Sequence, residues 1–297
     1  MATSTELAYG IAPPGHRLPA ETRLGCVRLA VADLGRSLEW YERVLGTTVH
    51  DRSGNVVTLG ADGDEAPIIE LHEWPGVEPV PGRGRIGLYH FAMLLPDRAA
   101  LGRFLAHLAA LGEQPGMADH GVSEALYLGD PDGLGIEVYA DRPRSEWRIM
   151  GGRQLYMTTE PLDVRDLLRA SRDEPWTGLP AGTVIGHVHL HVGDLEAASG
   201  FYHHALGFDK VVWSYPGALF LSAGGYHHHL GTNTWARHAE PAGESDARLL
   251  DWEILLPAVV DVERTAASLQ AAGHHLERDD AGIASADPWG TRLRIRA

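Results

Sequence analysis

The sequence predicts an α+β protein built from four copies of one module, each made of a strand, a helix and further strands. The first observation is an internal repeat: VRLAVADLGRSLEWYERVLG at residues 27–46 matches VHLHVGDLEAASGFYHHALG at residues 188–207 with an offset of 161. The second is another pair with the same offset, HFAMLLPDRAALGRFLAHLAALG at 90–112 and DWEILLPAVVDVERTAASLQAAG at 251–273. Because two separate segments repeat together, coincidence is a weak explanation.

The first repeat predicts a strand followed by a capped helix. Each copy begins with alternating apolar residues, as a half-buried strand does. Asp33 and Asp194 come next, where an N-cap carboxylate accepts free backbone N–H groups. The apolar residues from Leu34 to Leu45 keep helical spacing, and Gly46 is placed to end the helix.

The closing segment of each half is a tight turn that leads into a strand. DPDGLGIEVY at 130–139 and DPWGTRLRIR at 287–296 differ in position by 157, so the last segment has lost four residues. The length of 297 residues allows two domains, at ~150 residues each. The four modules are expected at about 24–75, 85–140, 183–236 and 248–297.

The expected organisation has four parts: an N-terminal arm at 1–22, an N-terminal pair of modules at 23–140, a connecting segment at 141–182 and a C-terminal pair at 183–297. The arm has Glu6 and three prolines where a signal peptide needs an apolar run, and it is expected to lie on the first domain. In the connecting segment, residues 161–171 predict one short helix. Trp147 and Trp176 are expected to be packing anchors.

Composition excludes several classes of partner. The formal net charge is −15 and Lys210 is the only lysine, so a nucleic acid or an anionic membrane surface would be repelled. No stretch approaches the ~20 apolar residues of a membrane helix. The single cysteine, Cys26, excludes an internal disulfide framework and a thiolate metal cluster, which favours a reducing, cytoplasmic location.

Four stretches give the chain a family resemblance: HFAMLLP, DHGVSEALYLGDPDGLGIEVYADRP, IGHVHLHVGDL and GGYHHHLGTNTW. With the four modules, they resemble the vicinal oxygen chelate (glyoxalase/bleomycin resistance/dioxygenase) superfamily, and more narrowly the extradiol ring-cleaving dioxygenases such as catechol 2,3-dioxygenases. The resemblance implies four βαβββ modules that form two cup-shaped domains. It also implies a metal, usually Fe(II) with Mn(II) as the alternative, held by two histidines and one carboxylate.

That ligand set leaves three positions open on the metal, enough for a catecholate and O₂. By the resemblance, one ligand comes from a module's opening strand and the carboxylate from a closing strand. His90 and Glu137 meet this description in module two, and His187 meets it in module three. We therefore expect modules two and three to share one cup that holds the metal through these three residues, although each residue alone could be structural.

Modules one and four would then form a second cup without a metal. Asp251 and Arg294 stand where module two has His90 and Glu137, and a cationic arginine cannot bind a dication. Cys26 occupies the corresponding place on the opening strand of module one, with Glu70 as the one nearby carboxylate.

Ring cleavage also needs groups that move protons, and the resemblance indicates three. His228, near the end of module three, matches the family position that approaches dioxygen and acts as acid and base. Tyr127 stands ten residues before Glu137, where a family tyrosine contacts a substrate oxygen. His120 resembles a family histidine near the substrate.

The triplet His227–His229 raises the question of which histidine faces the site. In an extended strand, His227 and His229 point to one face and His228 to the other. A reversed parity would transfer the role to His229. Of the remaining histidines, His189 and His191 are expected either in the pocket or on the surface, and His203 and His204 are expected to be solvated.

These observations favour an Fe(II)-dependent extradiol dioxygenase that acts on a small aromatic diol with O₂. The alternatives are another metal enzyme of this scaffold, either a glyoxalase-type isomerase or a thiol transferase, and a non-enzymatic small-molecule binding protein. A fourth ligand such as His228 would favour the isomerase or transferase. Assembly into a homo-oligomer stays open, as does which of four aromatic residues lines the pocket: Trp213, Tyr215, Phe220 or Trp235.

Overall fold

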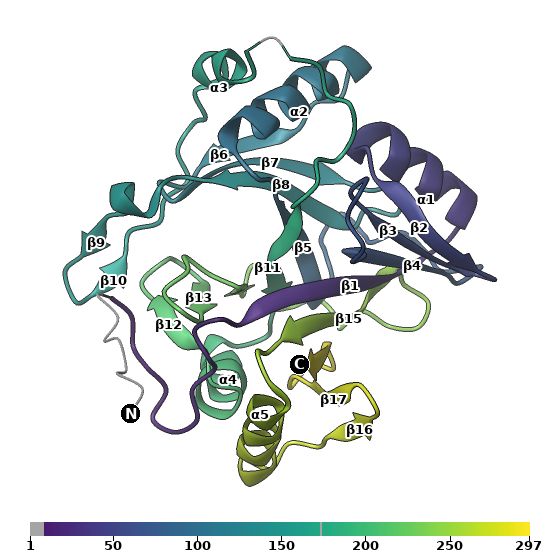
Figure 1. Cartoon of the computed structure of the whole chain (residues 1–297). Helices are drawn as coiled ribbons and strands as arrows, with labels where there is room; N and C mark the ends of the chain where they lie inside the picture. The colour runs from purple at the N-terminus through teal and green to yellow at the C-terminus, as the bar shows by residue number, and fades with distance from the viewer. Residues whose placement is uncertain (1–8, 173) are drawn as a thin grey trace.

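A computed structural model of the protein describes residues 9–172 and 174–297. It contains two curved eight-stranded sheets with helices on their outer sides (Figure 1). The predicted α+β fold of four βαβββ modules is confirmed, because each module contributes a strand, a helix and three more strands in that order. Of the helices in the described residues, none has the length and apolar character that a membrane crossing needs.

The first sheet joins modules two and three, as the ligand assignment required. Its central strands pair in antiparallel fashion, so the opening strands of the two modules lie side by side. In spatial order the strands are β12 (Asp209–Val212), β13 (Ala218–Ser222), β14 (Leu230–Asn233), β11 (Val184–His191), β5 (Gly87–Leu94), β8 (Gly135–Asp141), β7 (Ser123–Gly129) and β6 (Gly116–Asp119).

The second sheet joins modules four and one by the same scheme. Again the two opening strands pair in antiparallel fashion at the centre. In spatial order the strands are β16 (Glu277–Asp279), β17 (Gly282–Ala286), β18 (Arg292–Arg296), β15 (Arg248–Leu255), β1 (Arg23–Val31), β4 (Ile69–Glu73), β3 (Val56–Gly60) and β2 (Thr48–Ser53). Each sheet therefore takes one module from each half of the chain.

The helices begin and end where the sequence predicts. The Asp33 and Asp194 carboxylates accept N–H groups of the first turn, and Gly46 ends its helix at φ 73°. The helices are α1 (Leu34–Trp40), which continues as the π-helical turn η1 (Tyr41–Leu45), α2 (Arg98–Leu111), α3 (Val164–Ala170), α4 (Leu195–Ala198), which continues as η3 (Ser199–Ala205), and α5 (Val259–Ala271).

The connecting segment holds the predicted short helix, α3, and a small hairpin. Helix α3 packs on α2 at Gly102, where an added Cβ would lie 2.5 Å from the carbonyl oxygen of Leu167. The packing roles of Trp147 and Trp176 are confirmed, since Trp176 contacts Phe104 with ring centroids 5.0 Å apart and Trp147 contacts Tyr226 with ring centroids 6.2 Å apart. The other elements are η2 (Arg144–Glu146), β9 (Ile149–Met150) and β10 (Gln154–Leu155).

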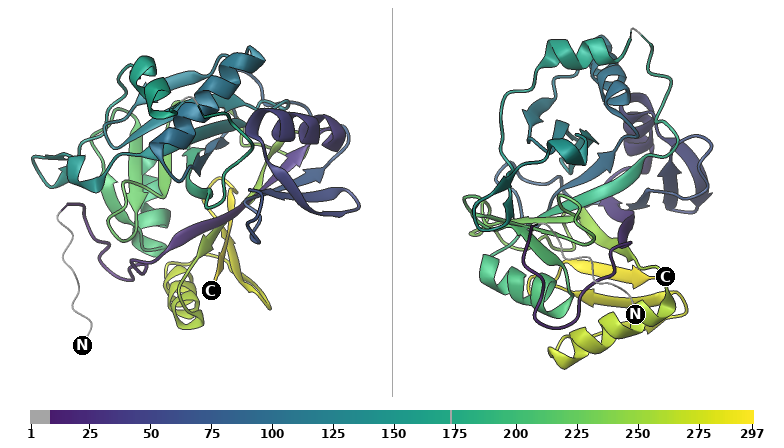
Figure 2. Two further views of the ribbon diagram at one scale, coloured as in Figure 1. Left: turned by 45° about the horizontal axis from the view of Figure 1, so that its top comes forward. Right: turned by 60° about the vertical axis from the view of Figure 1, so that its left-hand side comes forward.

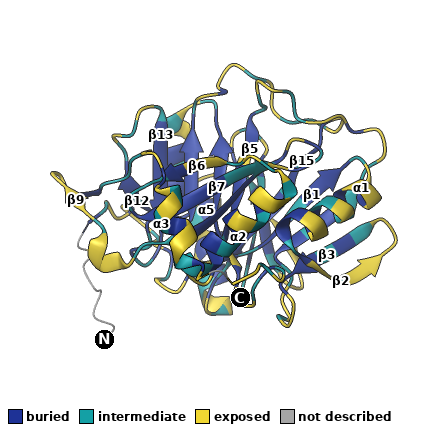
Figure 3. Ribbon diagram, turned by 90° about the horizontal axis from the view of Figure 1, so that it is seen from above, coloured by how far each residue is buried: buried dark blue, intermediate teal, exposed yellow. Residues whose placement is uncertain are grey.

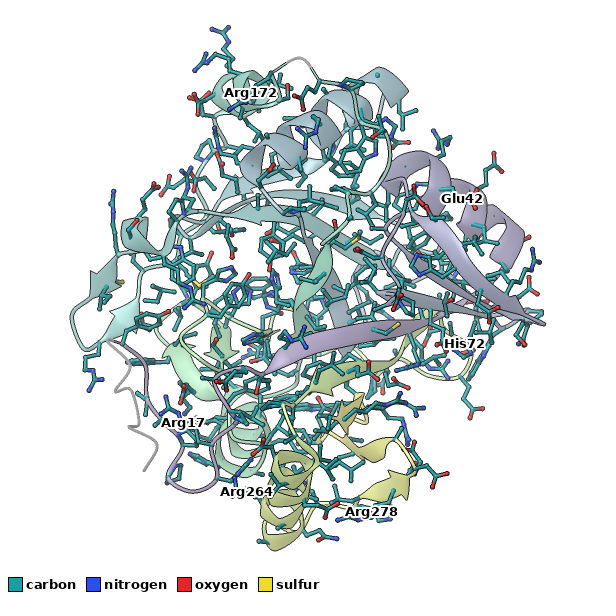
Figure 4. The ribbon with its side chains drawn as sticks, viewed as in Figure 1. Arg17, Glu42, His72, Arg172, Arg264 and Arg278 are labelled. Atoms are coloured by element: carbon teal, nitrogen blue, oxygen red, sulfur yellow. The ribbon has the colours of Figure 1, made fainter. Side chains whose placement is uncertain are left out.

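The expected position of the N-terminal arm is wrong. Its described part, from Tyr9, lies on module three and not on the first domain, as Figure 1 shows beside β12. Ile11 pairs with Lys210, and Arg17, labelled in Figure 4, forms a two-hydrogen-bond ion pair with the buried Asp209. A buried carboxylate is unfavourable without a cation beside it, and Arg17 of the arm provides that cation for Asp209.

The core lies between the sheets and their covering helices. Figure 3 shows the strands mostly buried and the outward faces of α2 and α3 exposed. Two further views place α2 and α3 at one end of the molecule and α5 with β16–β18 at the other (Figure 2). The concave face of the first sheet is thus left free to form a site.

Candidate metal centre

Three adjacent strands of the first sheet place His187, His90 and Glu137 on one face. His187 on β11 pairs with Ala92 on β5, and Ala92 pairs with Glu137 on β8, so these residues form one row across the sheet. His90 lies two residues before Ala92 and therefore on the same face. Ala92 keeps the middle of the row open because its side chain is small.

The three side chains converge on a single point. Glu137 Oε2 lies 3.0 Å from His90 Nε2 and 3.2 Å from His187 Nε2. One potential ligand atom from each residue lies within 4.8 Å of the others, and all three residues are buried. The buried His90 Nε2 approaches Glu137 at ion-pair distance but is not aligned for a hydrogen bond with any described residue. Two imidazoles and a carboxylate whose ligand atoms converge in a buried place fit a divalent cation.

The ionisation of these groups also suits a cation. Burial acts to raise the pKa of Glu137, but His187 and His90 outweigh it and hold that pKa well below its ordinary value. Burial lowers the pKa of His187 to about 4, against the opposing effect of Glu137. Near neutral pH the carboxylate is ionised and the His187 imidazole is neutral, which is the state that metal ligands require.

The cluster forms one wall of a cavity of about 310 Å³. We call it the site cavity. Its other walls are largely aromatic, and three of the four aromatic residues considered from the sequence line it: Tyr215, Phe220 and Trp235. Trp213 is not among the lining residues. A volume at the small end of ligand sites, with flat apolar walls, suits a compact aromatic molecule.

Tyr127 and His120 lie together on this wall. Tyr127 on β7 is directly opposite Glu137, and its hydroxyl lies 2.6 Å from His120 Nε2. His120 Nδ1 lies 2.6 Å from the carbonyl oxygen of Thr158, which can only accept a hydrogen bond. Nδ1 therefore donates, and Nε2 of the neutral ring accepts from Tyr127. Burial raises the pKa of Tyr127 well above its ordinary value, so this hydroxyl keeps its proton.

His228 lines the same cavity, with its ring centroid 4.0 Å from that of His187. His227 and His229 do not line it. The strand geometry behind the prediction is nevertheless wrong, because β14 begins only at Leu230. The ring of His227 does not point away from His228 but lies beside it.

His189 and His191 are buried, so the surface alternative for both is wrong. His189 lines the site cavity. Asn233 connects the two rings: its Oδ1 faces His191 Nδ1 at 2.7 Å, and its Nδ2 lies 3.0 Å from His189 Nε2. The backbone N–H of Trp235 donates to the same Oδ1, which sets the orientation of the amide. Sequence reasoning missed Asn233.

The prediction that His203 is solvated is wrong. Its ring is 2 % exposed and Nδ1 donates to the carbonyl oxygen of Phe208 at 2.7 Å. His204, on the same turn, is exposed as expected. The neighbours that bury His203 come from the packing of η3, which its helical position alone does not reveal.

The second cup contains ion pairs in place of the histidine cluster. Asp251 accepts from Arg28 at 2.8 Å and from Arg294 at 3.0 Å. Glu253 stands where the first sheet has the small Ala92, and it fills that place. His72, labelled in Figure 4, lies at the side of this cup and contacts Glu70. Among the described residues, only the first sheet's His90, Glu137 and His187 form a cluster of potential metal ligands.

Paired βαβββ modules that fold into open cups define a class of protein by their architecture alone. The chain belongs to the Glyoxalase/Bleomycin resistance protein/Dioxygenase superfamily, because the model of that family matches residues 23–138 and 184–294. Catechol-2,3-dioxygenase of Bacillus subtilis (strain 168) is 45% identical over 271 residues, which cover 90% of this chain and 94% of the relative.

Solved structures agree on the fold. A putative dioxygenase from Bacillus subtilis superposes with a TM-score of 0.64 at 12% identity, covering 95% of this chain and 86% of its own. Glyoxalase I from Zea mays superposes with a TM-score of 0.54 at 18% identity, covering 93% and 92%. At these identities the likeness concerns the fold and not the reaction.

Proposed function

We propose that the protein is an Fe(II)-dependent extradiol dioxygenase that cleaves the ring of a catechol-like aromatic with O₂. The observation that carries the proposal is the convergence of His90, His187 and Glu137 at the wall of a cavity with aromatic sides. The relationship to a protein named catechol-2,3-dioxygenase supports the same reaction class.

In this proposal His90, His187 and Glu137 hold the metal. A facial set of three ligands leaves three further positions, and the bound metal supplies them to the diol and O₂. Mn(II) prefers similar ligands and is the alternative ion. The aromatic walls, including Phe220 and Tyr215, stack on the ring and keep water away from it.

Three side chains accept, return or hold the protons of the reaction: His228, Tyr127 and His120. Burial and the neighbouring histidines lower the pKa of His228 well below its ordinary value, so its ring is neutral and accepts a proton from the diol. Later in the reaction the same ring returns that proton. Tyr127 keeps its proton, which it donates to His120 in the substrate-free site, and on substrate binding this one hydrogen turns to a substrate oxygen.

The isomerase and transferase alternatives use a fourth protein ligand. His228 is the nearest candidate, yet it is not a member of the cluster of mutually close ligand atoms. A purely binding role leaves the three converging ligand side chains without a purpose. The dioxygenase proposal uses all of these residues.

The test is anaerobic loading of the purified protein with Fe(II), or with Mn(II) in a parallel sample, followed by catechol and air. We expect a yellow ring-cleaved product from the loaded protein. His187→Ala should lose both bound metal and product, whereas His204→Ala, which changes an exposed histidine, should keep both. Full metal occupancy without product from any of several catechols would contradict the proposal.

A further inference from the structure

We propose that Asp141 and His227 are positioning residues that set the tautomer of His228, so that its Nε2 faces the site cavity without a proton and is ready to accept one. The proposal deepens the proposed function, on which the acid–base role of His228 rests. It gives a task to the first histidine of the triplet, which the ligand set and the cavity walls leave without one.

The three side chains form a continuous hydrogen-bonded chain. Asp141 Oδ1 lies 2.9 Å from His227 Nε2, and His227 Nδ1 lies 2.7 Å from His228 Nδ1. The hydroxyl of Tyr226 donates to the same Oδ1 of Asp141 at 3.2 Å, so this oxygen acts as an acceptor. Each link in the chain is within hydrogen-bonding distance.

The direction of every proton follows from the carboxylate. An ionised carboxylate only accepts, so His227 Nε2 carries a hydrogen and donates it to Asp141. A neutral imidazole has one N–H, which leaves His227 Nδ1 as an acceptor. Two facing nitrogens at 2.7 Å need one donor, and His228 Nδ1 must be that donor. The second nitrogen of His228, Nε2, then has no proton.

Because His227 occupies Nδ1 of His228, Nε2 is the nitrogen left to serve the site cavity. His228 lines that cavity, and Nε2 has no hydrogen-bond partner among the described residues. His227 is fully buried, and its ring packs against Tyr139, Tyr226 and Trp147. Water therefore does not compete for the nitrogens of His227, and each nitrogen keeps its role as donor or acceptor.

The strand that carries a candidate ligand also anchors this chain. Asp141 ends β8 four residues after Glu137, so both side chains are on one face of the strand. The Tyr139 and Tyr226 hydroxyls lie 2.6 Å apart and connect β8 to the segment before β14. The Asp141 side chain is 28% exposed, so its replacement disturbs the core little.

The first measurement is the tautomer of His228 in the full-length metal-free protein, read from two-bond ¹H–¹⁵N spectra of a ¹⁵N-histidine sample. His228→Phe assigns the signal by its loss. We expect His228 to carry its proton on Nδ1 in the native protein. Asp141→Ala should move a large share of that proton to Nε2, and Asp141→Asn, which keeps an acceptor oxygen, should move less. A proton on Nε2 in the native protein would overturn the proposal.

The second measurement is kinetic, on iron-loaded protein with catechol. Asp141→Ala and His227→Phe should lower kcat at least about tenfold, within the usual range for acid–base groups, and change KM for catechol less than about twofold. Iron content and melting temperature should stay close to native, and His204→Ala is the control. An unchanged kcat in both variants would overturn the inference. If no variant and no native sample cleaves any catechol while the tautomer is as described, the proposed function fails and the positioning role stands.

Discussion

Ala92 separates two candidate metal ligands in one row of the first sheet. Its neighbours in that row are His187 and Glu137, and the space between them is open only because the central side chain is a methyl group. In the second sheet the repeat places Glu253 there, and its Oε2 accepts the backbone N–H of Cys26. The size of one residue thus distinguishes the central rows of the two sheets: a methyl group lies between two candidate ligands in the first, and a carboxylate side chain occupies that place in the second.

Ala92→Leu should weaken metal binding without removing a ligand. The larger side chain fills the point where His90, His187 and Glu137 converge, and we expect at least about a tenfold loss of affinity, in the range seen when ligand support is disturbed. Metal content after anaerobic loading and desalting measures this. Ala30→Leu in the second sheet, equally buried, is the control for overpacking. Equal metal content in both variants would contradict the prediction.

The sequence predicts the positions of the candidate ligands because each falls at a fixed place in a repeated module. It does not predict the hydrogen-bonded chain from Asp141 to His228, because this chain depends on an irregular segment that precedes β14. Alternation along a strand has no meaning in such a segment. The burial of His203 and the link through Asn233 were missed for a related reason, since their partners come from elements distant in sequence.

The aspartate of each closing turn forms a hydrogen bond with the repeated tyrosine of a helix in another module. The Asp130 carboxylate accepts backbone N–H groups of its own turn and the hydroxyl of Tyr41 from module one. Asp287 does the same for its turn, with Tyr202 from module three. The sequence shows that the tyrosine and the aspartate both repeat. Only the fold shows that they repeat as partners, because they belong to different modules.

Burial raises the pKa of Asp130 from 3.8 to about 7, although the backbone N–H of Leu134 opposes the shift. The folded chain therefore holds this proton to a higher pH than the unfolded chain. Its contribution to stability is complete below about pH 4 and is lost as the pH rises to about 7. The uncharged amide of Asp130→Asn resembles the protonated carboxyl but does not titrate, so this variant does not lose that stability as the pH rises.

The free energy of unfolding of the native protein, relative to Asp130→Asn, should therefore fall by up to about 4 kcal/mol between pH 4 and pH 7, at about 1.4 kcal/mol per pKa unit. Chemical denaturation at several pH values measures the difference. Asp280→Asn, which changes an exposed carboxylate, should show a constant difference. A constant difference for Asp130→Asn as well would show that the buried carboxyl is not protonated.

The two cups of the whole molecule share an architecture and differ in what holds their centre. In the first, His90, His187 and Glu137 converge on the wall of the site cavity, and in the second, ion pairs of Arg28 and Arg294 with Asp251 line a cavity without a cluster of histidines among its described residues. The repeat predicts both cups and the loss of the ligand set in the second. It does not predict where the arm lies, because the acceptor Asp209 is distant in sequence.

Asp251→Asn should lower the free energy of unfolding by about 1–3 kcal/mol, because two partly buried arginines lose a shared partner while other carboxylates still face Arg28. Glu277→Gln removes the partner of Arg292 at an exposed site and should cost clearly less than Asp251→Asn, because solvent screens this ion pair. Urea denaturation measures both. Metal content of the first cup should be native in each variant. Equal costs would indicate that the second cup is not held by its central ion pairs.

The pairing of modules is nested, with two and three inside and one and four outside. A chain that leaves the ribosome therefore presents β5, β8, β11 and β14 in time for the inner sheet to form before the last module exists. Strand β1 is made first but finds its partner β15 only near the end of synthesis, and β18 comes last of all. Domains generally fold as units during synthesis. The newborn protein can thus complete its candidate metal cup while β1, already paired with β4, still lacks its second neighbour, β15.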